Sequence, residues 1–243
     1  AFGAMVREIS RHEKVLLIAR GDTRAVEKLA CFGVNQANLH VFDFDSNDTW
    51  ARDFGPITIL EDGTPVLLDF EFNGWGRKYP SYELDNGLTR RLHDAGAFAK
   101  GVACRPMHMV LEGGSIDSDG QGTILTTTAC LSHPQRNGQL SLAQIEARLC
   151  LELGARRVLH LQHGVLQGDD TDSHVDTLAR FAPNDTIVHV TCDDPADDHY
   201  KDIGRMVDEL RAFRTADGKP YRLLPLPWPG ARCGWIEFYN RDK

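Results

Sequence analysis

Short apolar runs alternate with longer amphipathic stretches along most of the chain. A short apolar run bounded by turn formers is typical of a buried strand, and apolar positions three and four residues apart are typical of a helix. This pattern predicts helices at residues 2–11, 23–32, 81–96, 141–153 and 197–213. It predicts strands at residues 15–19, 39–44, 57–60, 66–70, 109–116, 123–127, 158–161, 177–181, 186–190 and 221–226.

Two pairs of predicted strands are joined by turn formers, at Glu61–Gly63 and Asp117–Gly122, and are interpreted as hairpins. A doubly wound α/β sheet would contain fewer hairpins. The order strand, strand, helix, strand recurs about three times, which indicates structural repeats, as in a propeller of mixed α/β units. No linker separates domains, so the sequence predicts a single domain over residues 1–243.

The overall charge limits the class of partner. The formal net charge of −8 argues against a nucleic-acid partner, which needs a basic surface. An acidic protein is compatible with a cationic small-molecule substrate, although acidity also serves solubility alone. No apolar run is long enough to cross a bilayer and no stretch resembles a secretory signal, so we expect no membrane partner.

The cysteines favour a reducing compartment. No two of the six form a C-x-x-C pair; they stand at positions 31, 104, 130, 150, 192 and 233. Neither a zinc ribbon nor a thioredoxin-like motif is supported, and we expect free thiols in a cytoplasmic protein. The first ten residues already resemble the interior of an amphipathic helix, so we also expect this sequence to be a fragment.

Polar stretches that follow predicted strands hold the candidate site residues, because sites are usually built on such loops. In residues 47–56, Arg52 and Asp53 are expected either to form an ion pair beside a buried Trp50 or to leave Trp50 and Asp53 facing a cation. An aromatic face and a carboxylate together suit a guanidinium group.

A second stretch, residues 111–117, contains Glu112 in what the pattern predicts to be an apolar strand. A carboxylate there is costly unless it is paired. Its partner is expected to be a lysine or arginine, a catalytic histidine or a substrate, and the sequence alone leaves these alternatives open.

A third stretch, residues 168–181, surrounds His174 with aspartates. His174 and Asp176 are two residues apart, so on a strand they would face the same side and supply an acid/base and a carboxylate to one pocket. The alternatives are a metal site and a solvated acidic loop. The stretch lacks the glycine and late glutamate of a calcium loop, and a zinc site would want more histidine or cysteine nearby.

A fourth stretch, residues 69–76 with Lys78 and Tyr79, is expected to be either a wall of the site or an aromatic-rich strand end.

Taken together, these stretches resemble the agmatine deiminase and bacterial-type peptidyl-arginine deiminase family. The similarity is carried by residues 47–56 (NDTWARDFGP), 111–127 (LEGGSIDSDGQGTILTT), 130–137 (CLSHPQRN) and 168–181 (GDDTDSHVDTLARF), with 85–86 and 88–89. It extends to about Pro229 and is strongest toward the agmatine deiminase branch. The resemblance implies an α/β fold, a five-bladed α/β propeller of ββαβ units (pentein fold). It also implies that this chain is incomplete at both ends.

The resemblance assigns roles to residues of this sequence. Asp53 and Asp176 would clamp the guanidinium, Glu112 would orient His174 as general acid and base, and Trp50 would wall the pocket. A cysteine thiolate would attack the guanidinium carbon of agmatine, ammonia would leave, and hydrolysis of the thiouronium would give N-carbamoylputrescine. No metal or organic cofactor is implied. The expected ligand is a small cationic guanidine, and a homo-oligomer is left open.

The sequence departs from the family at the nucleophile. No G-G-x-N-x-H-C stretch is present, and the late Cys233 is flanked by Arg232 and Gly234, which do not match. We therefore expect the nucleophilic cysteine to be absent from this chain and the chain alone to be inactive. The alternatives are a non-catalytic guanidine- or polyamine-binding protein, a deiminase acting on arginine or peptidyl-arginine, and a truncated product without stable function.

Overall fold

The protein is described by a computed structural model that covers residues 2–21 and 23–228. The described residues form two compact units, one of residues 2–21, 23–74 and 79–108 and the other of residues 75–78 and 109–228. The late Cys233 lies outside the described residues. None of the described helices is both long and apolar enough to span a bilayer.

The first unit opens with alternating helices and strands: α1 (Phe2–Ser10), β1 (Val15–Ile18), α2 (Thr23–Cys31), η1 (Gln36–Asn38) and β2 (Leu39–Phe42). The strands β1 and β2 pair in parallel, with Val15 opposite Leu39. The side chain of Asn35 caps η1 by accepting from the Ala37 amide, and that short turn leads directly into β2.

The first unit continues with α3 (Ala51–Phe54) and the hairpin of β3 (Ile57–Glu61) and β4 (Thr64–Glu71). After α4 (Gly74–Arg77), α5 (Glu83–Asn86) and α6 (Leu88–Asp94), the strand β5 (Ala103–Val110) returns to lie beside β4. Residues 66–70 of β4 are all buried and form the core of this sheet.

The second unit contains two sheets of the same design. In one, β6 (Ile116–Ser118) and β7 (Thr123–Thr127) are antiparallel, and β8 (Arg157–Leu161) joins β7 in parallel after α7 (Thr128–Leu131), α8 (Pro134–Asn137) and α9 (Leu142–Leu153). In the other, β9 (Ala179–Ala182) and β10 (Thr186–Val190) are antiparallel, and β11 (Arg222–Leu226) joins β10 after α10 (Tyr200–Ala212). Two single turns, η2 (Gly113–Ser115) and η3 (Val175–Thr177), precede β6 and β9.

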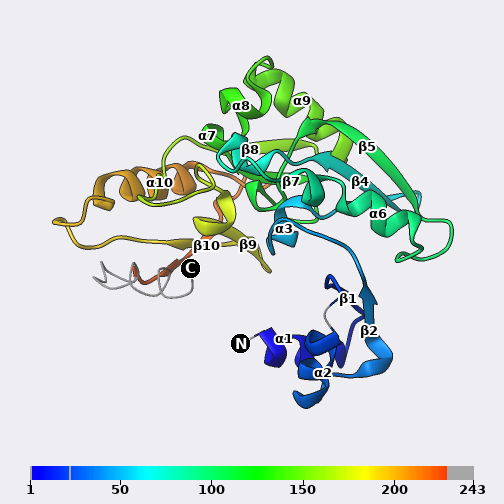
Figure 1. The fold of residues 1–243 in the computed structure, drawn as a ribbon. Helices are drawn as coiled ribbons and strands as arrows, with labels where there is room; N and C mark the ends of the chain where they lie inside the picture. The colour runs from blue at the N-terminus through cyan, green and yellow to red at the C-terminus, as the bar shows by residue number, and fades with distance from the viewer. Residues whose placement is uncertain (1, 22, 229–243) are drawn as a thin grey trace. The chain divides into compact units, whose positions relative to one another are not determined.

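Three of the four sheets in the described chain thus follow the order strand, strand, helix, strand, and Figure 1 shows them as separate small sheets. The repeat that the sequence predicts is confirmed. Strands β8 and β11 pair in parallel with β7 and β10, and a parallel return strand needs a crossover, which explains why a helix stands before each of them.

The core of the second unit is built on α10. Its residues Ile203, Met206, Val207 and Leu210 are buried, at the spacing of one helical face, and pack with Leu161 and Leu178. Gly164 passes so close to this core that a Cβ there would lie 2.9 Å from Leu178 and 3.0 Å from Met206. The helix therefore fixes the segment that leads toward His174.

Several predicted elements differ from the structure. The predicted strand at residues 109–116 is wrong, because β5 ends at Val110 and the adjacent Gly113 and Gly114 form a turn. The predicted helix at residues 81–96 is two short helices that meet at Gly87, a poor helix former. The predicted strand at residues 177–181 begins only at Ala179, after η3.

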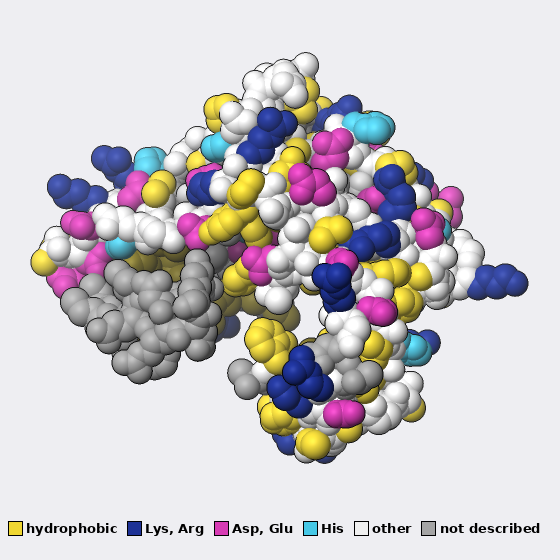
Figure 2. Space-filling model, viewed as in Figure 1, with side chains coloured by type: hydrophobic (Ala, Val, Ile, Leu, Met, Phe, Trp, Pro, Cys, Tyr) yellow, Lys and Arg dark blue, Asp and Glu magenta, His cyan; other side chains and the backbone are white. Residues whose placement is uncertain are grey.

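On the face that Figure 2 shows, the acidic and basic side chains of the described residues are interspersed. The negative net charge is therefore not gathered into one block on that face.

Candidate active site

Glu112 lies fully buried in the turn that follows β5. Ser115 closes this turn, since its amide and its hydroxyl donate to the Glu112 carbonyl at 3.0 and 2.6 Å. Gly113 and Gly114 are buried beside it. A buried carboxylate is costly without partners, so its neighbours decide whether it is charged.

The first partner of Glu112 is Arg136 on α8. The Nε of Arg136 lies 2.9 Å from both carboxylate oxygens, and both side chains are 1% exposed. The rest of the guanidinium is held by the Asp172 carboxylate at 3.3 Å and the Thr171 carbonyl at 2.8 Å. The guanidinium therefore has fixed partners on two sides.

The second partner of Glu112 is His174, the residue that caps η3. Its Nε2 lies 3.4 Å from Oε2 of Glu112, and its Nδ1 lies 3.9 Å from Oδ1 of Asp176. The imidazole is 2% exposed and the Asp176 side chain 23%. Of the partners left open for Glu112 by the sequence, the structure provides both a basic residue and the histidine.

The strand geometry expected for His174 and Asp176 is wrong, because Asp176 lies within η3 and not on a strand. The preceding loop is instead shaped by Asp169, whose carboxylate accepts from the Thr171 amide at 2.8 Å and the Ser173 amide at 2.6 Å. Asp172 and Ser173 adopt left-handed backbone angles, with φ of 59° and 66°. These bonds turn the chain sharply just before His174.

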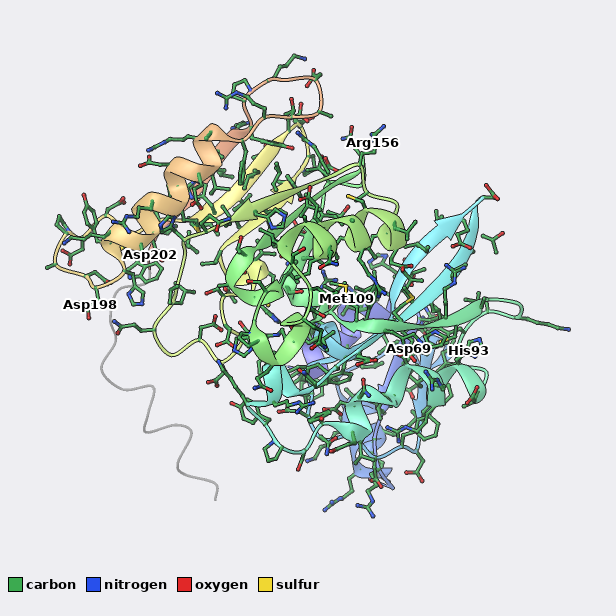
Figure 3. All side chains as sticks on the ribbon, turned by 90° about the horizontal axis from the view of Figure 1, so that it is seen from above. Asp69, His93, Met109, Arg156, Asp198 and Asp202 are labelled. Atoms are coloured by element: carbon green, nitrogen blue, oxygen red, sulfur yellow. The ribbon has the colours of Figure 1, made fainter. Side chains whose placement is uncertain are left out.

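The start of this loop is fixed by α10. Asp202, at the start of that helix (Figure 3), accepts from the backbone amides of Gly164 and Val165 at 2.7 Å each. A carboxylate in the first helical turn is also favoured by the helix dipole. The loop that carries His174 is thus bound to a packed helix.

The charge of Glu112 is set by opposing effects. Burial alone would raise its pKa, but the hydrogen bond to His174 and the charge and hydrogen bonds of Arg136 lower the pKa below its ordinary value. Burial likewise acts to raise the pKa of Asp172, and its bond to Lys78 together with the charge of Arg136 lowers it. Glu112 is therefore an ionised carboxylate facing an imidazole.

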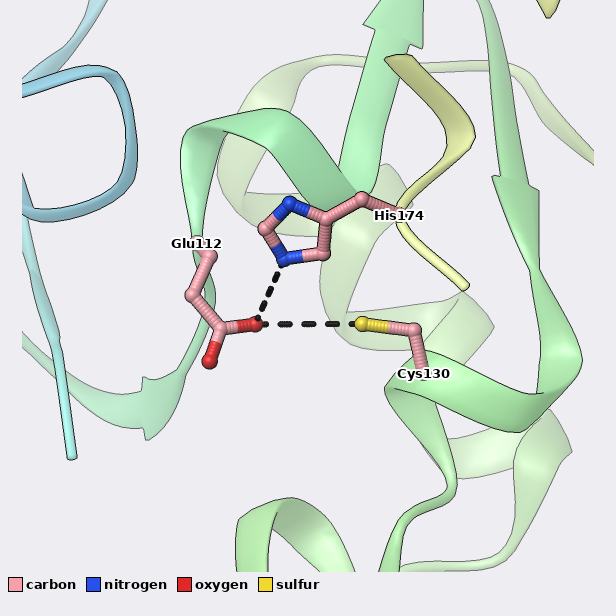
Figure 4. Close-up of side chains that lie close together, drawn as sticks. All are labelled: Glu112, Cys130 and His174. Carbon is pink, nitrogen blue, oxygen red and sulfur yellow. Dashed lines mark hydrogen bonds and ion pairs between the residues drawn. The ribbon is translucent and has the colours of Figure 1, made fainter. Parts of the chain in front are cut away.

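Cys130, on α7, is a neighbour that the sequence did not indicate as a site residue. Its Sγ lies 3.8 Å from Oε2 of Glu112, and the residue is fully buried (Figure 4). Burial, followed by the negative charge of Glu112, raises the pKa of this thiol well above its ordinary value. Cys130 is therefore a protonated donor to the carboxylate and poorly suited to be a nucleophile.

Glu112, Cys130 and His174 each offer a possible metal ligand, and these atoms lie within 4.8 Å of one another. Their surroundings do not fit a metal ion. Both oxygens of Glu112 already accept from Arg136, so a cation would lie beside a buried guanidinium, and the Cys130 thiol would have to lose a tightly held proton.

Trp50 and Asp53 lie in the first unit, whereas Glu112, His174 and Asp176 lie in the second. Asp53 is buried in α3 and Trp50, which precedes that helix, is 54% exposed. Their convergence with His174 on one substrate stays a prediction.

The loop that carries Trp50 is fixed within the first unit. The Asp85 carboxylate accepts from the amides of Asn47 and Asp48, at 2.7 and 3.0 Å. Asn86 accepts from the Phe72 amide at 2.7 Å. The Asp-Asn pair at residues 85–86 therefore orders two loops, which gives the motif a structural role.

The fourth stretch divides between two environments. Asp69 ends up buried in β4 with Arg90 at 3.1 Å, as in an ordinary strand. Beyond it, Lys78 belongs to the second unit, where its Nζ lies 2.5 Å from Oδ1 of Asp172 and 3.0 Å from the Asp170 carbonyl. Lys78 thus braces the loop before His174.

The sequence predicted a partner for Glu112 but not its identity. Arg136 follows Glu112 by 24 residues in the sequence, and Asp172 follows Arg136 by 36 residues. Arg136 and Cys130 fall in the quoted stretch 130–137, which was the only available signal. Their roles depend on contacts that no spacing rule predicts.

Comparison with known proteins finds similarity to one family over nearly the whole chain. The model of the Porphyromonas-type peptidyl-arginine deiminase family matches residues 1–240. An agmatine deiminase of Stutzerimonas stutzeri is 32% identical over 235 residues, which cover 95% of this chain and 62% of that protein.

Solved structures agree with this result. A Porphyromonas gingivalis protein, provisionally named an arginine deiminase, is 46% identical with a TM-score of 0.90, covering 96% of this chain and 68% of that one. A C. jejuni agmatine deiminase with a cysteine-to-serine change and bound substrate is 37% identical with a TM-score of 0.85, covering 96% and 66%. The predicted fold class, an α/β propeller, is confirmed.

Proposed function

The chain belongs to the Porphyromonas-type peptidyl-arginine deiminase family, and from this we propose that it acts in hydrolysing the guanidinium of agmatine to N-carbamoylputrescine and ammonia. It spans 62% of the length of the S. stutzeri agmatine deiminase. The activity, the substrate and the partner of the whole protein are therefore parts of this proposal.

The observation that carries the proposal is the buried pair of Glu112 and His174 with Asp176 on the other side of the imidazole. An N–H at Nε2 that donates to Glu112 leaves Nδ1 facing Asp176. A guanidinium held by Asp176 would then lie next to Nδ1, which could exchange a proton with it. A charged carboxylate at Nε2 also stabilises the protonated imidazole that such catalysis requires.

We propose the following roles. Asp176 and Asp53 would each bind guanidinium N–H groups, and Trp50 would cover the flat cation. A thiolate would form a bond to the guanidinium carbon, and His174 would give a proton to one nitrogen, which leaves as ammonia. Water would then lose a proton to His174 and bond to the same carbon. The C–S bond would break, restoring the thiolate and releasing the ureido product.

The thiolate is not assigned to a described cysteine. Cys130 is the described cysteine that contacts Glu112, and its raised pKa argues against it. Cys233 lies outside the described residues and lacks the family's flanking residues. We propose that the nucleophile is not among the 243 residues and that the chain alone binds without turnover.

The test is an assay of ammonia and N-carbamoylputrescine with agmatine as substrate. The 243-residue chain is compared with any longer product that its gene encodes. We expect calorimetric binding of agmatine by the chain and turnover only by a longer form. Turnover by the 243-residue chain would contradict the missing nucleophile, and no binding by either form would contradict the proposed function.

A second candidate substrate is arginine, free or at the end of a peptide. It is favoured by the 46% identity to the protein named as an arginine deiminase, which exceeds the 37% identity to the C. jejuni agmatine deiminase structure. Agmatine and arginine differ only at the end remote from the guanidinium. Release of citrulline or peptidyl-citrulline without N-carbamoylputrescine would establish this alternative.

A further inference from the structure

Glu112 accepts from three side chains on three different segments. Arg136 comes from α8, His174 precedes η3, and Cys130 comes from α7. The nearest contacts belong to Arg136, at 2.9 Å to each oxygen. The position of the carboxylate that faces His174 therefore depends first on Arg136.

Arg136, together with the hydrogen bond to His174, also helps to keep Glu112 charged. A carboxylate this deeply buried would bind a proton if no positive charge offset its lost hydration. If Glu112 were protonated, one of its two oxygens would carry the proton and only the other would remain a bare acceptor. The side chain would also have no negative charge to stabilise a protonated His174. Removing one partner of a buried ion pair costs far more than the pair itself contributes, because the other charge is left alone.

Arg136 is in turn held in one orientation. Its neighbour Asn137 is buried and bonds both backbone groups of Val110, accepting from the amide at 3.2 Å and donating to the carbonyl at 3.0 Å. Asp172 receives Arg136 on one side and Lys78 on the other. A continuous line of contacts therefore runs from Lys78 through Asp172 and Arg136 to Glu112.

The backbone beside Arg136 is strained in a way that needs such support. Asp172 and Ser173 are consecutive left-handed residues without glycine. Such a residue is energetically unfavourable and persists only where surrounding contacts hold it. Here the bonds to Asp169, Arg136 and Lys78 hold it, so the same contacts that fix Arg136 also aim His174.

We propose that Arg136 is a positioning residue for this site, which keeps Glu112 ionised and directed at Nε2 of His174. This inference rests on the proposed function for the catalytic role of His174. The contact between Arg136 and Glu112 does not depend on that function. Arg136 does not touch the reacting atoms and acts through Glu112. A fork of fixed N–H groups suits this task better than the single flexible ammonium of a lysine.

Other charged or titratable groups also face this pair and enter any titration. Within the second unit they are Cys130, Asp176, Asp172, His133 and Lys78. Asp172 is balanced by Lys78, and the Cys130 thiol stays protonated. Arg136 is a positive group in direct contact with Glu112. Its replacement by a neutral residue therefore removes one positive charge from the surroundings of the carboxylate.

The test follows the Glu112 carboxyl by ¹³C NMR in chain labelled at glutamate, with Glu112→Gln assigning the signal. Arg136→Gln should raise the pKa of Glu112 by about one unit or more, because burial is then opposed less. The control is Arg157→Gln, since Arg157 donates to Thr123, Arg214 and Tyr221 and not to Glu112. An unchanged Glu112 titration in folded Arg136→Gln, matching the control, would overturn the proposal.

The variant Arg136→Lys covers the case in which Arg136→Gln does not fold. It keeps the charge but not the fork. In a form of the protein that turns agmatine over, kcat should fall about tenfold while KM changes less than about twofold. A wild-type kcat for Arg136→Lys would overturn the positioning role. Because the NMR titration needs no turnover, failure of a longer form to turn agmatine over would count against the proposed function alone.

Discussion

Glu112 is a charged residue that is fully buried, which is rare unless the charge is paired. Its burial is compatible with its charge because Arg136, His174 and Cys130 all direct hydrogen-bond donors at the carboxylate. Asp176 differs, since it is partly exposed and faces the opposite nitrogen of His174. These two carboxylates therefore suit different tasks, one holding the histidine and the other meeting a ligand.

This division predicts the effect of changing Asp176. In a form of the protein with turnover, Asp176→Asn should lower kcat by at least a hundredfold, because a neutral amide cannot bind a guanidinium as a carboxylate does. The fold should persist, since Asp176 is not in the core. Asp170→Asn is the matched control on the same loop. Near-normal steady-state kinetics for Asp176→Asn would remove it from the proposed clamp.

At the scale of helices and strands, the sequence predicted the features that the periodicity of apolar residues determines. The three ββαβ repeats follow from hairpin turns, apolar runs and helical spacing, and the structure confirms them. The sequence did not predict the local structure where a single side chain forms hydrogen bonds with the backbone. The Asp169 carboxylate shapes the turn before His174, and the Ser115 hydroxyl shapes the turn after Glu112. Neither turn produces a periodic pattern of apolar residues in the sequence.

Helix α9 offers a test of an element predicted correctly from its start. Ser141 accepts from the Gln144 amide, and the Gln144 side chain accepts from the Ser141 amide, which completes a capping box. Ser141→Ala should lower the free energy of unfolding by about 1 kcal/mol, because the Gln144 amide at the helix start loses its side-chain acceptor.

Urea denaturation followed by circular dichroism measures this difference. Ser141→Asp is the matched control, since aspartate also caps a helix and should stay close to the wild-type stability. Equal losses in both variants would mean that the hydroxyl contributes by another contact.

At the scale of the whole molecule, the candidate site residues come from far apart in sequence. Sequence motifs were sufficient to name Trp50, Asp53, Glu112, His174 and Asp176 by resemblance. They could not reveal that Glu112 is held by Arg136, because this contact depends on the path of the chain through α7 and α8. Spacing rules describe neighbours along one helix or strand, whereas this contact joins two different segments of the chain.

The pH dependence of stability is also a property of the whole chain. On β8, His160 is partly buried, and in the described part of the chain neither of its ring nitrogens has a hydrogen-bond partner. Burial lowers its pKa below the ordinary 6.5, against the charge of Glu146, whose carboxylate lies 3.8 Å away. The unfolded chain therefore binds this proton more tightly than the folded chain.

It follows that the free energy of unfolding should fall as the pH drops through 6.5 and below. Glu112 and Asp172 act later, since their folded pKa values are lowered from 4.5 and 3.8, and their contribution is lost below those values. Asp69 and Asp85 oppose this late loss, because burial raises the pKa of each in the folded protein. The decline between pH 7 and pH 5 should therefore come mainly from His160.

Urea unfolding between pH 7.5 and pH 5 tests this assignment. His160→Leu should flatten the decline in that range, because the variant lacks the imidazole whose burial makes the unfolded chain bind this proton more tightly. His108→Leu is the control, since the His108 side chain is 86% exposed and its removal should leave the slope as in the wild type. An equal slope in His160→Leu and the wild type would show that another group governs the loss of stability. The buried imidazole on β8 would then have no part in the acid sensitivity of the protein.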